Sequence, residues 1–227
     1  MAGDRDGWPC FSMAGDGVRV DGFPVVWAPG QPAIEFPRDS GVPVTTRHKL
    51  VLQIHYNLAN HPTSGVADRT LVRLRFAERV SRVGAFVIVD PLLESLTSEA
   101  PLRLPPGEAS VQVSFRRSVR QVGAGSIPFL ELEGVMAHMH GRARRYRFEV
   151  GAAPSAACAL DIPEWDPHWQ RLYFYAQPRP VAFDTLLGAT CDYDTSGDTE
   201  PVSPGWSIAD EMCATILYFS APNLGAL

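Results

Sequence analysis

The stretch FLELEGVMAHMH, Phe129–His140, together with RRYRFEV, Arg144–Val150, decides the fold class. Apolar and polar residues alternate through much of both stretches, as they do in strands with one buried face. Similar short apolar runs occur along the rest of the chain and are interrupted by 19 glycines and 20 prolines. This punctuation favours many short strands over long helices.

Seven further segments share this texture, and we expect them to be strands. They are Lys49–Tyr56, Thr70–Phe76, Gly84–Val89, Ala109–Phe115, Leu172–Tyr175, Leu186–Tyr193 and Thr215–Phe219. No run of a dozen residues has a convincing helical period, and the best candidate, Val89–Glu99, is interrupted by Pro91. Strands at such short spacing predict an all-β protein folded as an antiparallel β-sandwich.

The chain has 227 residues, which suits one all-β domain. Its first 45 residues are rich in glycine, proline and aspartate, with Trp8, Trp27 and Phe36 as isolated anchors. A free linker rarely contains two tryptophans, so we expect residues 1–45 to form an extended arm packed on the sandwich. Residues 46–227 would then form the sandwich domain.

The overall composition excludes several classes of protein. With 45% hydrophobic and 20% charged residues, the chain is too apolar to be disordered. A net charge of −5 argues against nucleic acid as a partner. No apolar run is long enough to cross a membrane, and the start, MAGDRDGWPC, lacks a signal peptide's apolar segment. A cytoplasmic protein and a secreted protein with its signal removed both fit.

The histidines of the pair H-x-H, His138 and His140, are the first candidates for chemistry. Residues two apart on a strand point to the same face, so both imidazoles would project together. This is the simplest way for a sheet to offer two nitrogen ligands to one metal. The alternative is a pair of polar residues on a solvated strand face.

Two other side chains could belong to a metal site. Met212 lies in IADEMCATILYF, where it follows two acids and precedes a cysteine at the entry to an apolar strand. Methionine is usually core filler, but a thioether beside two imidazoles would suit Cu(I). His55, in LVLQIHY, is a lone strand histidine, and such residues are usually structural.

Several common functional motifs are missing. The chain has no G-x-S-x-G elbow, no P-loop and no dinucleotide fingerprint, which disfavours nucleophilic and nucleotide-dependent enzymes. The four cysteines Cys10, Cys158, Cys191 and Cys213 include no C-x-x-C pair, so a thiolate zinc site is not indicated. The acidic segment Asp192–Glu200 lacks the pattern of a calcium loop.

Taken together, these segments resemble the copper type II, ascorbate-dependent monooxygenases, the family of peptidylglycine α-hydroxylating monooxygenase and dopamine β-monooxygenase. The similarity runs in family order from about residue 8 to residue 221. The matching segments are LVLQIHYN (50–57), GVMAHMHGR (134–142), WDPHWQRLYFY (165–175), ATCDYDT (189–195) and DEMC (210–213).

The resemblance implies a C-terminal domain of this family, with a jelly-roll fold. In the family this domain holds the copper that binds dioxygen, through the H-x-H histidines and a methionine. His138, His140 and Met212 would be its copper ligands and catalytic residues here. The resemblance also implies a disulfide between Cys191 and Cys213.

Two departures from the family pattern affect the expected function. The chain has no His-His pair, so the electron-transfer copper would keep only His55, as a vestigial site, and we expect the family's N-terminal domain to be missing. Peptide-amidating members grip a substrate carboxylate with arginine, asparagine and tyrosine. The matching residues are Met136, Ala214 and Ile216, which would form an apolar wall of the substrate pocket.

We therefore expect a copper-dependent oxidation, most simply the hydroxylation, of a small apolar molecule. It would require dioxygen and an external reductant, and a separate chain could supply the missing domain. Two alternatives remain open. The scaffold could be repurposed for a non-redox step such as a cyclisation or isomerisation, or it could be a non-catalytic copper-binding module.

Overall fold

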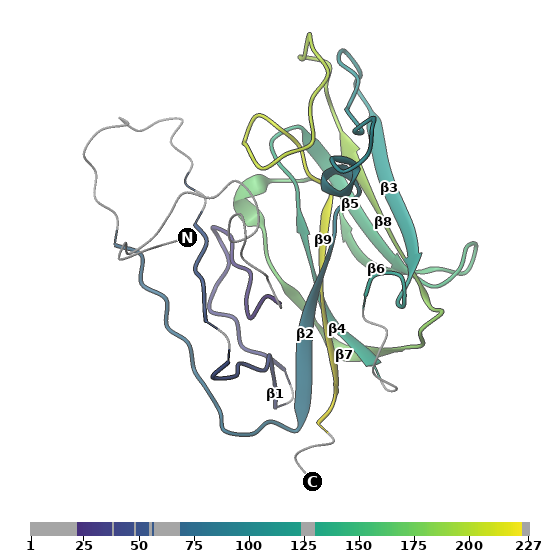
Figure 1. The fold of residues 1–227 in the computed structure, drawn as a ribbon. Coiled ribbons are helices and arrows are strands. Elements are labelled where there is room, and N and C mark those ends of the chain that lie inside the picture. Colours follow the sequence, from purple (N-terminus) through teal and green to yellow (C-terminus); the bar gives the residue numbers. More distant parts are fainter. Residues whose placement is uncertain are drawn as a thin grey trace.

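Two β-sheets face each other in the computed structural model, which describes residues 22–37, 39–47, 49–54, 56, 69–123 and 130–223 (Figure 1). The larger sheet has the order β1 (Ser40–Gly41), β2 (Arg82–Val89), β9 (Ala214–Pro222), β4 (Leu130–His138) and β7 (Tyr173–Val181). The smaller has the order β3 (Val111–Ser118), β8 (Leu186–Tyr193), β5 (Ala143–Val150) and β6 (Ala157–Ile162). All neighbours pair antiparallel except β1 and β2. The predicted all-β sandwich is confirmed.

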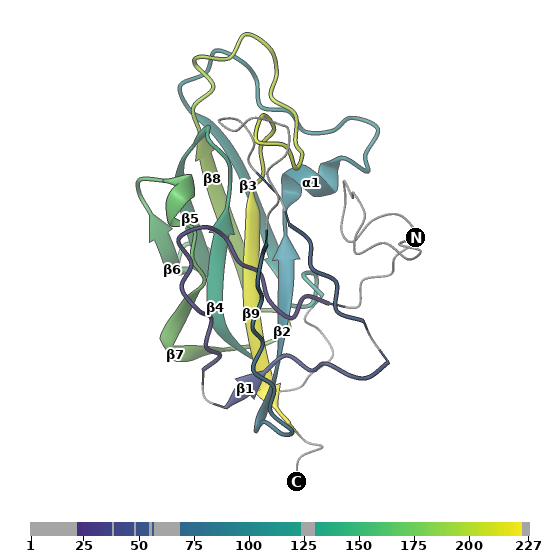
Figure 2. The same cartoon turned by 90° about the vertical axis from the view of Figure 1, so that its left-hand side faces the viewer.

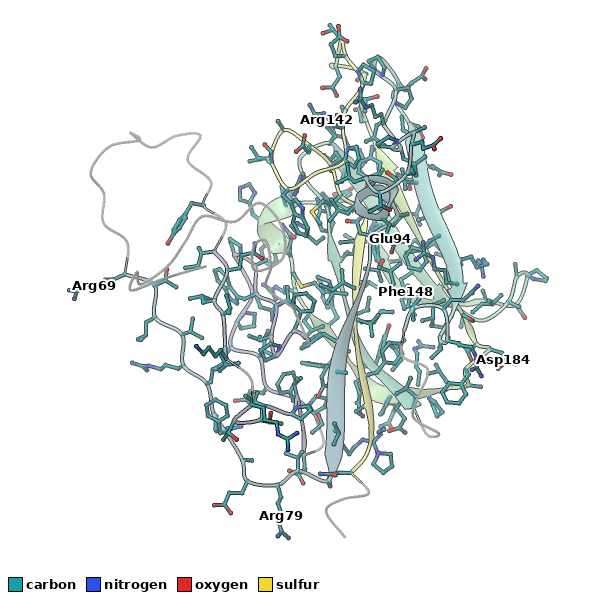
Figure 3. All side chains as sticks on the ribbon, viewed as in Figure 1. Arg69, Arg79, Glu94, Arg142, Phe148 and Asp184 are labelled. Carbon is teal, nitrogen blue, oxygen red and sulfur yellow. A yellow bond between two sulfur atoms is a disulfide. The ribbon has the colours of Figure 1, made fainter. Side chains whose placement is uncertain are left out.

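The hydrophobic core lies between the two sheets, and alternation along the strands selects its members. From β4, Val135 and Ala137 point inward, whereas Met136 belongs to a second cluster on the outer face. Tyr146 and Phe148 of β5 fill the core from the opposite sheet. Phe148 is labelled in Figure 3. A strand with one face in the core shows this period of two.

The outer face of the five-stranded sheet is covered by the described part of the arm (Figures 1 and 2). Phe36 stacks on Tyr218 of β9, with ring centroids 5.0 Å apart, and the Tyr218 hydroxyl donates a hydrogen bond to Ser40 Oγ at 3.1 Å. Gly84 on β2 makes room for the Tyr218 ring, because a Cβ there would lie 2.0 Å from its hydroxyl oxygen. This cover explains why β9 is buried on both faces. A domain boundary at residue 46 stays a prediction.

Two predicted strands are wrong. The described residues of Lys49–Tyr56 and all of Thr70–Phe76 lie outside any strand. In Figure 1 both segments lie apart from the two sheets, and Leu71 and Phe76 are 74% and 65% exposed. Alternation is a local property, whereas a strand also needs a neighbour to pair with, and neither segment belongs to a sheet of the described residues.

The sequence analysis also missed two strands, the two-residue β1 and the edge strand β6, and misread one proline. The edge strand β6 alternates Cys158, Leu160 and Ile162, a signal short enough to be overlooked. Pro91 begins the helix α1 (Pro91–Ser95) instead of interrupting it, because proline suits the first helical turn. Within the described residues, no helix is long and apolar enough to cross a membrane.

The two sheets are joined covalently by the predicted disulfide, which is confirmed. Cys191 lies on β8 of the smaller sheet, and Cys213 immediately precedes β9 of the larger sheet, with Cα atoms 6.0 Å apart. The bond therefore attaches the start of β9 to the opposite layer.

Replacing both cysteines, as Cys191→Ala with Cys213→Ala, should lower the free energy of unfolding. The bond closes a loop of 22 residues, which corresponds to about 3 kcal/mol in the chain-entropy account. Urea denaturation of the variant and the parent measures the difference. The exposed free cysteine gives the control, since Cys158→Ala should leave the unfolding free energy unchanged. Equal stability of the double variant and this control would contradict the prediction.

Candidate metal centre

The pairing of β4 with β9 brings the two predicted ligand segments side by side. Its register places Met136 opposite Ile216 and His138 opposite Ala214. Continued by two residues, the same register leads to His140 and Met212. Directly opposed residues of an antiparallel pair project from the same face, which here is the outer face of the sheet.

The structure brings His138 and His140 together. Their ring centroids are 5.2 Å apart, the ring planes are nearly perpendicular, and both side chains are half-buried. His138 Nδ1 contacts Gln170 Oε1, and His140 Nδ1 lies 2.9 Å from the carbonyl oxygen of Asp210. Because both partners are acceptors, each Nδ1 must donate. In the neutral imidazoles the lone pair is then on Nε2, as in most histidines that bind a metal.

Gln170 orients His138 from a separate segment. It follows the single 3-10 turn η1 (Pro167–Trp169), and its Nε2 donates to the Pro167 carbonyl oxygen at 2.8 Å. That bond leaves Oε1 to accept from His138. Asp166 caps the turn by accepting from the His168 backbone N–H at 2.8 Å. The sequence analysis did not identify Gln170, although it lies in the segment WDPHWQRLYFY that carries part of the resemblance.

A buried carboxylate holds the backbone around His140. Glu211 accepts from the backbone N–H of His140 at 3.0 Å and from that of Arg142 at 2.8 Å. Burial raises the pKa of the Glu211 carboxyl, and these backbone N–H groups oppose the rise. The neighbouring Asp210 carbonyl holds the His140 ring, so one short run, Asp210–Met212, both orients a histidine and carries the methionine.

Met212 is buried, and the backbone around it is held from three sides. The Tyr193 hydroxyl donates to the Met212 carbonyl oxygen at 2.6 Å, and burial raises the pKa of Tyr193 well above its usual value. The adjacent Cys213 is tied to Cys191, and its backbone N–H donates to Asp90 Oδ1 at 3.2 Å. The position of Met212 is therefore set by the packed body of the sandwich.

The chemistry of the available donors limits which metal the histidine pair could hold. Among the residues the structure describes, no group of three His, Cys, Asp or Glu side chains could hold a metal ion. Among these described residues, a third protein donor to a metal at His138 and His140 would have to be of another kind. The thioether of Met212 is such a donor, and two imidazoles with a thioether suit copper better than zinc or calcium.

The residues predicted to line a substrate pocket are closed off in this structure. Met136, Ala214 and Ile216 are only 1%, 1% and 4% exposed. Met136 and Ile216 pack with Leu172 and with Ala28 of the arm. The predicted apolar wall thus lies beneath the arm. His55, the predicted vestigial ligand, lies outside the described residues.

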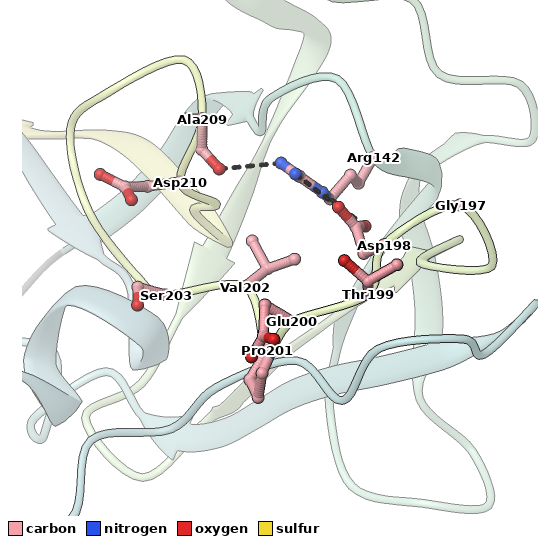
Figure 4. A pocket seen from close by; sticks show the side chains of 10 residues that line it. All are labelled: Arg142, Gly197, Asp198, Thr199, Glu200, Pro201, Val202, Ser203, Ala209 and Asp210. Atoms are coloured by element: carbon pink, nitrogen blue, oxygen red, sulfur yellow. Dashed lines mark hydrogen bonds and ion pairs between the residues drawn. The ribbon is translucent and has the colours of Figure 1, made fainter.

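A polar hollow of about 340 Å³ lies beside the candidate centre (Figure 4). Arg142 lines the hollow. Its guanidinium donates hydrogen bonds to the Asp198 carboxylate, with which it forms an ion pair, and to the Ala209 carbonyl oxygen at 2.9 Å. Asp210 also lines it, on the same loop that holds the His140 ring. The hollow is not the apolar pocket expected from the sequence.

Part of the chain matches a known protein family. Residues 134–225 match the family model described as the copper type II ascorbate-dependent monooxygenase, C-terminal domain. This stretch is similar to the family's C-terminal domain. The match begins within β4 and ends just after β9, so His138, His140 and Met212 all fall inside the matched residues.

A curated relative extends the similarity beyond this domain. Tyramine beta-hydroxylase of Caenorhabditis briggsae is 26% identical over 205 residues, which is 85% of this chain. The alignment covers 33% of that relative, so the chain spans about a third of the length of the curated protein it matches. The predicted resemblance to the copper type II monooxygenases is confirmed.

Gln170→Leu should weaken Cu(I) binding about 10- to 100-fold, the usual effect of losing a partner that orients a ligand. The leucine cannot accept from His138 Nδ1, so the imidazole loses its fixed tautomer. Gln170→Glu keeps an acceptor and should stay within a few-fold of the parent. Competition with a Cu(I) chelator of known affinity measures both variants. Equal affinities for the Leu and Glu variants would show that Gln170 does not orient the ligand.

Proposed function

We propose that this domain binds one copper ion through His138, His140 and Met212 and uses it to hydroxylate a small apolar molecule. The observation that carries the proposal is the state of the histidine pair. Both imidazoles project from one sheet face, and both donate from Nδ1 to an oxygen, which leaves the lone pair of each neutral ring on Nε2, the atom that would bind the ion.

The three side chains would have different roles at the copper. His138 and His140 would bind as neutral imidazoles, and Met212 would add a soft donor that favours Cu(I). Bound copper would supply the redox chemistry for R–H + O₂ + 2 e⁻ + 2 H⁺ → R–OH + H₂O. The two electrons must come from an external reductant, and the name of the family points to ascorbate.

The substrate we propose is apolar at the end that reaches the copper. Met136, Ala214 and Ile216 offer no charge and no side-chain donor, and an unpaired buried carboxylate costs several kcal/mol. Glycine-extended peptides should therefore be poor substrates. The relative is named for tyramine, a small aromatic amine, which makes tyramine a reasonable first compound to test. Because the arm covers Met136 and Ile216, we propose entry beside the half-buried histidines.

The supply of electrons sets a second expectation. Within these 227 residues, His55 would be the one match to the ligands of the family's electron-transfer site, and one imidazole cannot fix the geometry of a second copper. We propose that the isolated chain binds one copper and is a slow ascorbate-driven hydroxylase. A further domain or a separate chain that contributes a histidine pair would raise the rate.

Copper content and oxygen consumption test the proposal together. The chain loaded with Cu(I) under reducing conditions should retain one copper, as measured by elemental analysis. His138→Ala and His140→Ala should each lose it, and Met212→Ala should weaken binding less. The control is His168→Ala, because this imidazole is 86% exposed and lies outside the pair. Product formation from tyramine, with oxygen uptake, would be followed in the loaded protein.

Each outcome separates the proposal from its alternatives. One copper per chain with oxygen uptake and a hydroxylated product supports it. Turnover that continues without oxygen would contradict hydroxylation and indicate a repurposed, non-redox enzyme. Two results would contradict the assigned site. One is a protein that contains no copper after treatment with Cu(I) under reducing conditions, and the other is a His138→Ala variant that retains all of its copper.

A further inference from the structure

A tight turn of the arm, residues 28–31, packs against the segment that carries Gln170. The Gln31 backbone N–H donates to the Ala28 carbonyl oxygen at 3.0 Å, and Trp27 Nε1 donates to the Gln31 carbonyl oxygen at 2.9 Å. These bonds present the Gln31 side chain to the strand region beside it. Gln31 Oε1 accepts from the Leu172 backbone N–H at 2.5 Å.

A second contact of the turn is between backbones. Gly30 has φ +87°, and a Cβ built on it would lie 2.5 Å from the His168 carbonyl oxygen. Only glycine combines this backbone conformation with so close an approach. Gly30 therefore lets the arm lie directly against η1. The segment containing residues 22–31 passes η1 in both views of the ribbon (Figures 1 and 2).

The two contacts flank the residue that orients His138. His168 lies two residues before Gln170, and Leu172 lies two residues after it. Ala28, in the same turn, is buried in one cluster with Leu172 and Met136. The turn thus restrains the segment on both sides of Gln170, whose Oε1 accepts from His138 Nδ1.

We propose that the turn Ala28–Gln31 is a positioning element of the metal centre. It holds residues 168–172 against the sheet, which keeps Gln170 on His138 Nδ1 and leaves the lone pair on Nε2. The arm is then more than a cover for an apolar face. The effect on copper rests on the proposed function, whereas the effect on the His138 tautomer is a property of the metal-free protein.

The tautomer can be read directly in metal-free protein labelled with ¹⁵N-histidine. Two-bond nitrogen–proton correlations distinguish a ring protonated at Nδ1 from one protonated at Nε2, and His138→Ala assigns the signals. His138 should be the Nδ1–H tautomer in the parent. Gly30→Ala displaces the His168 carbonyl, so His138 should shift toward the Nε2–H tautomer that imidazole prefers in water.

Gly107→Ala is the matched control. Gly107 also has a positive φ, +76°, but no heavy atom lies within 4 Å of its added Cβ. The Gly107→Ala substitution therefore introduces the same kind of backbone strain without displacing a neighbouring residue. The His138 tautomer should stay as in the parent. Gln31→Leu is the second test variant, because it removes the acceptor for the Leu172 N–H without adding strain. It carries the test if Gly30→Ala does not fold.

Cu(I) affinity in the same variants completes the experiment. Gly30→Ala and Gln31→Leu should each bind about tenfold more weakly than Gly107→Ala, in the range usual for residues that support a ligand. An unchanged Nδ1–H tautomer with unchanged Cu(I) affinity in both test variants would overturn the inference. If the tautomer shifts in the test variants but neither they nor the parent bind copper, the positioning role is supported and the proposed function is refuted.

Discussion

Antiparallel pairing between β4 and β9 brings together segments more than 70 residues apart, and the candidate metal centre depends on its register. Opposed residues share a face, so the same pairing that puts Met136 and Ile216 outside puts Val135 and Leu217 in the core. A slip of one residue would bury the histidines and expose the core. The apolar residues of both faces therefore hold the candidate ligands in place as well as stabilising the sandwich.

The two ends of the centre are supported in different ways. Met212 is anchored from inside the sandwich, by Tyr193, by Asp90 and by the bond from Cys213 to the opposite sheet. The histidines are held at their Nδ1 atoms by loop segments, through Gln170 and the Asp210 carbonyl. The methionine is thus set by the core, and the orientation of the imidazoles is set by the loops. Changes in the loops should alter affinity before they alter the fold.

The sequence predicts features that depend on a short repeat of apolar and polar residues. It misses features that depend on contacts between residues far apart in the chain. A period of two was enough to place His138 and His140 on one face, and resemblance supplied the Cys191–Cys213 bond. Alternation alone was misleading in Thr70–Phe76, where the described residues provide no neighbouring strand. Gln170 was not foreseen because it lies 32 residues from the histidine it contacts. Orienting contacts of this kind leave no local pattern in the chain.

X-ray absorption spectroscopy of the chain loaded with Cu(I) tests the central claim most directly, because it identifies the ligand atoms without requiring turnover. The account predicts two imidazole nitrogens and one sulfur as copper ligands. The sulfur should be absent in Met212→Leu. It should be retained in the control Cys158→Ala, which removes an exposed free cysteine. A sulfur signal that survives Met212→Leu, or a site with nitrogen and oxygen ligands alone in the parent, would contradict it.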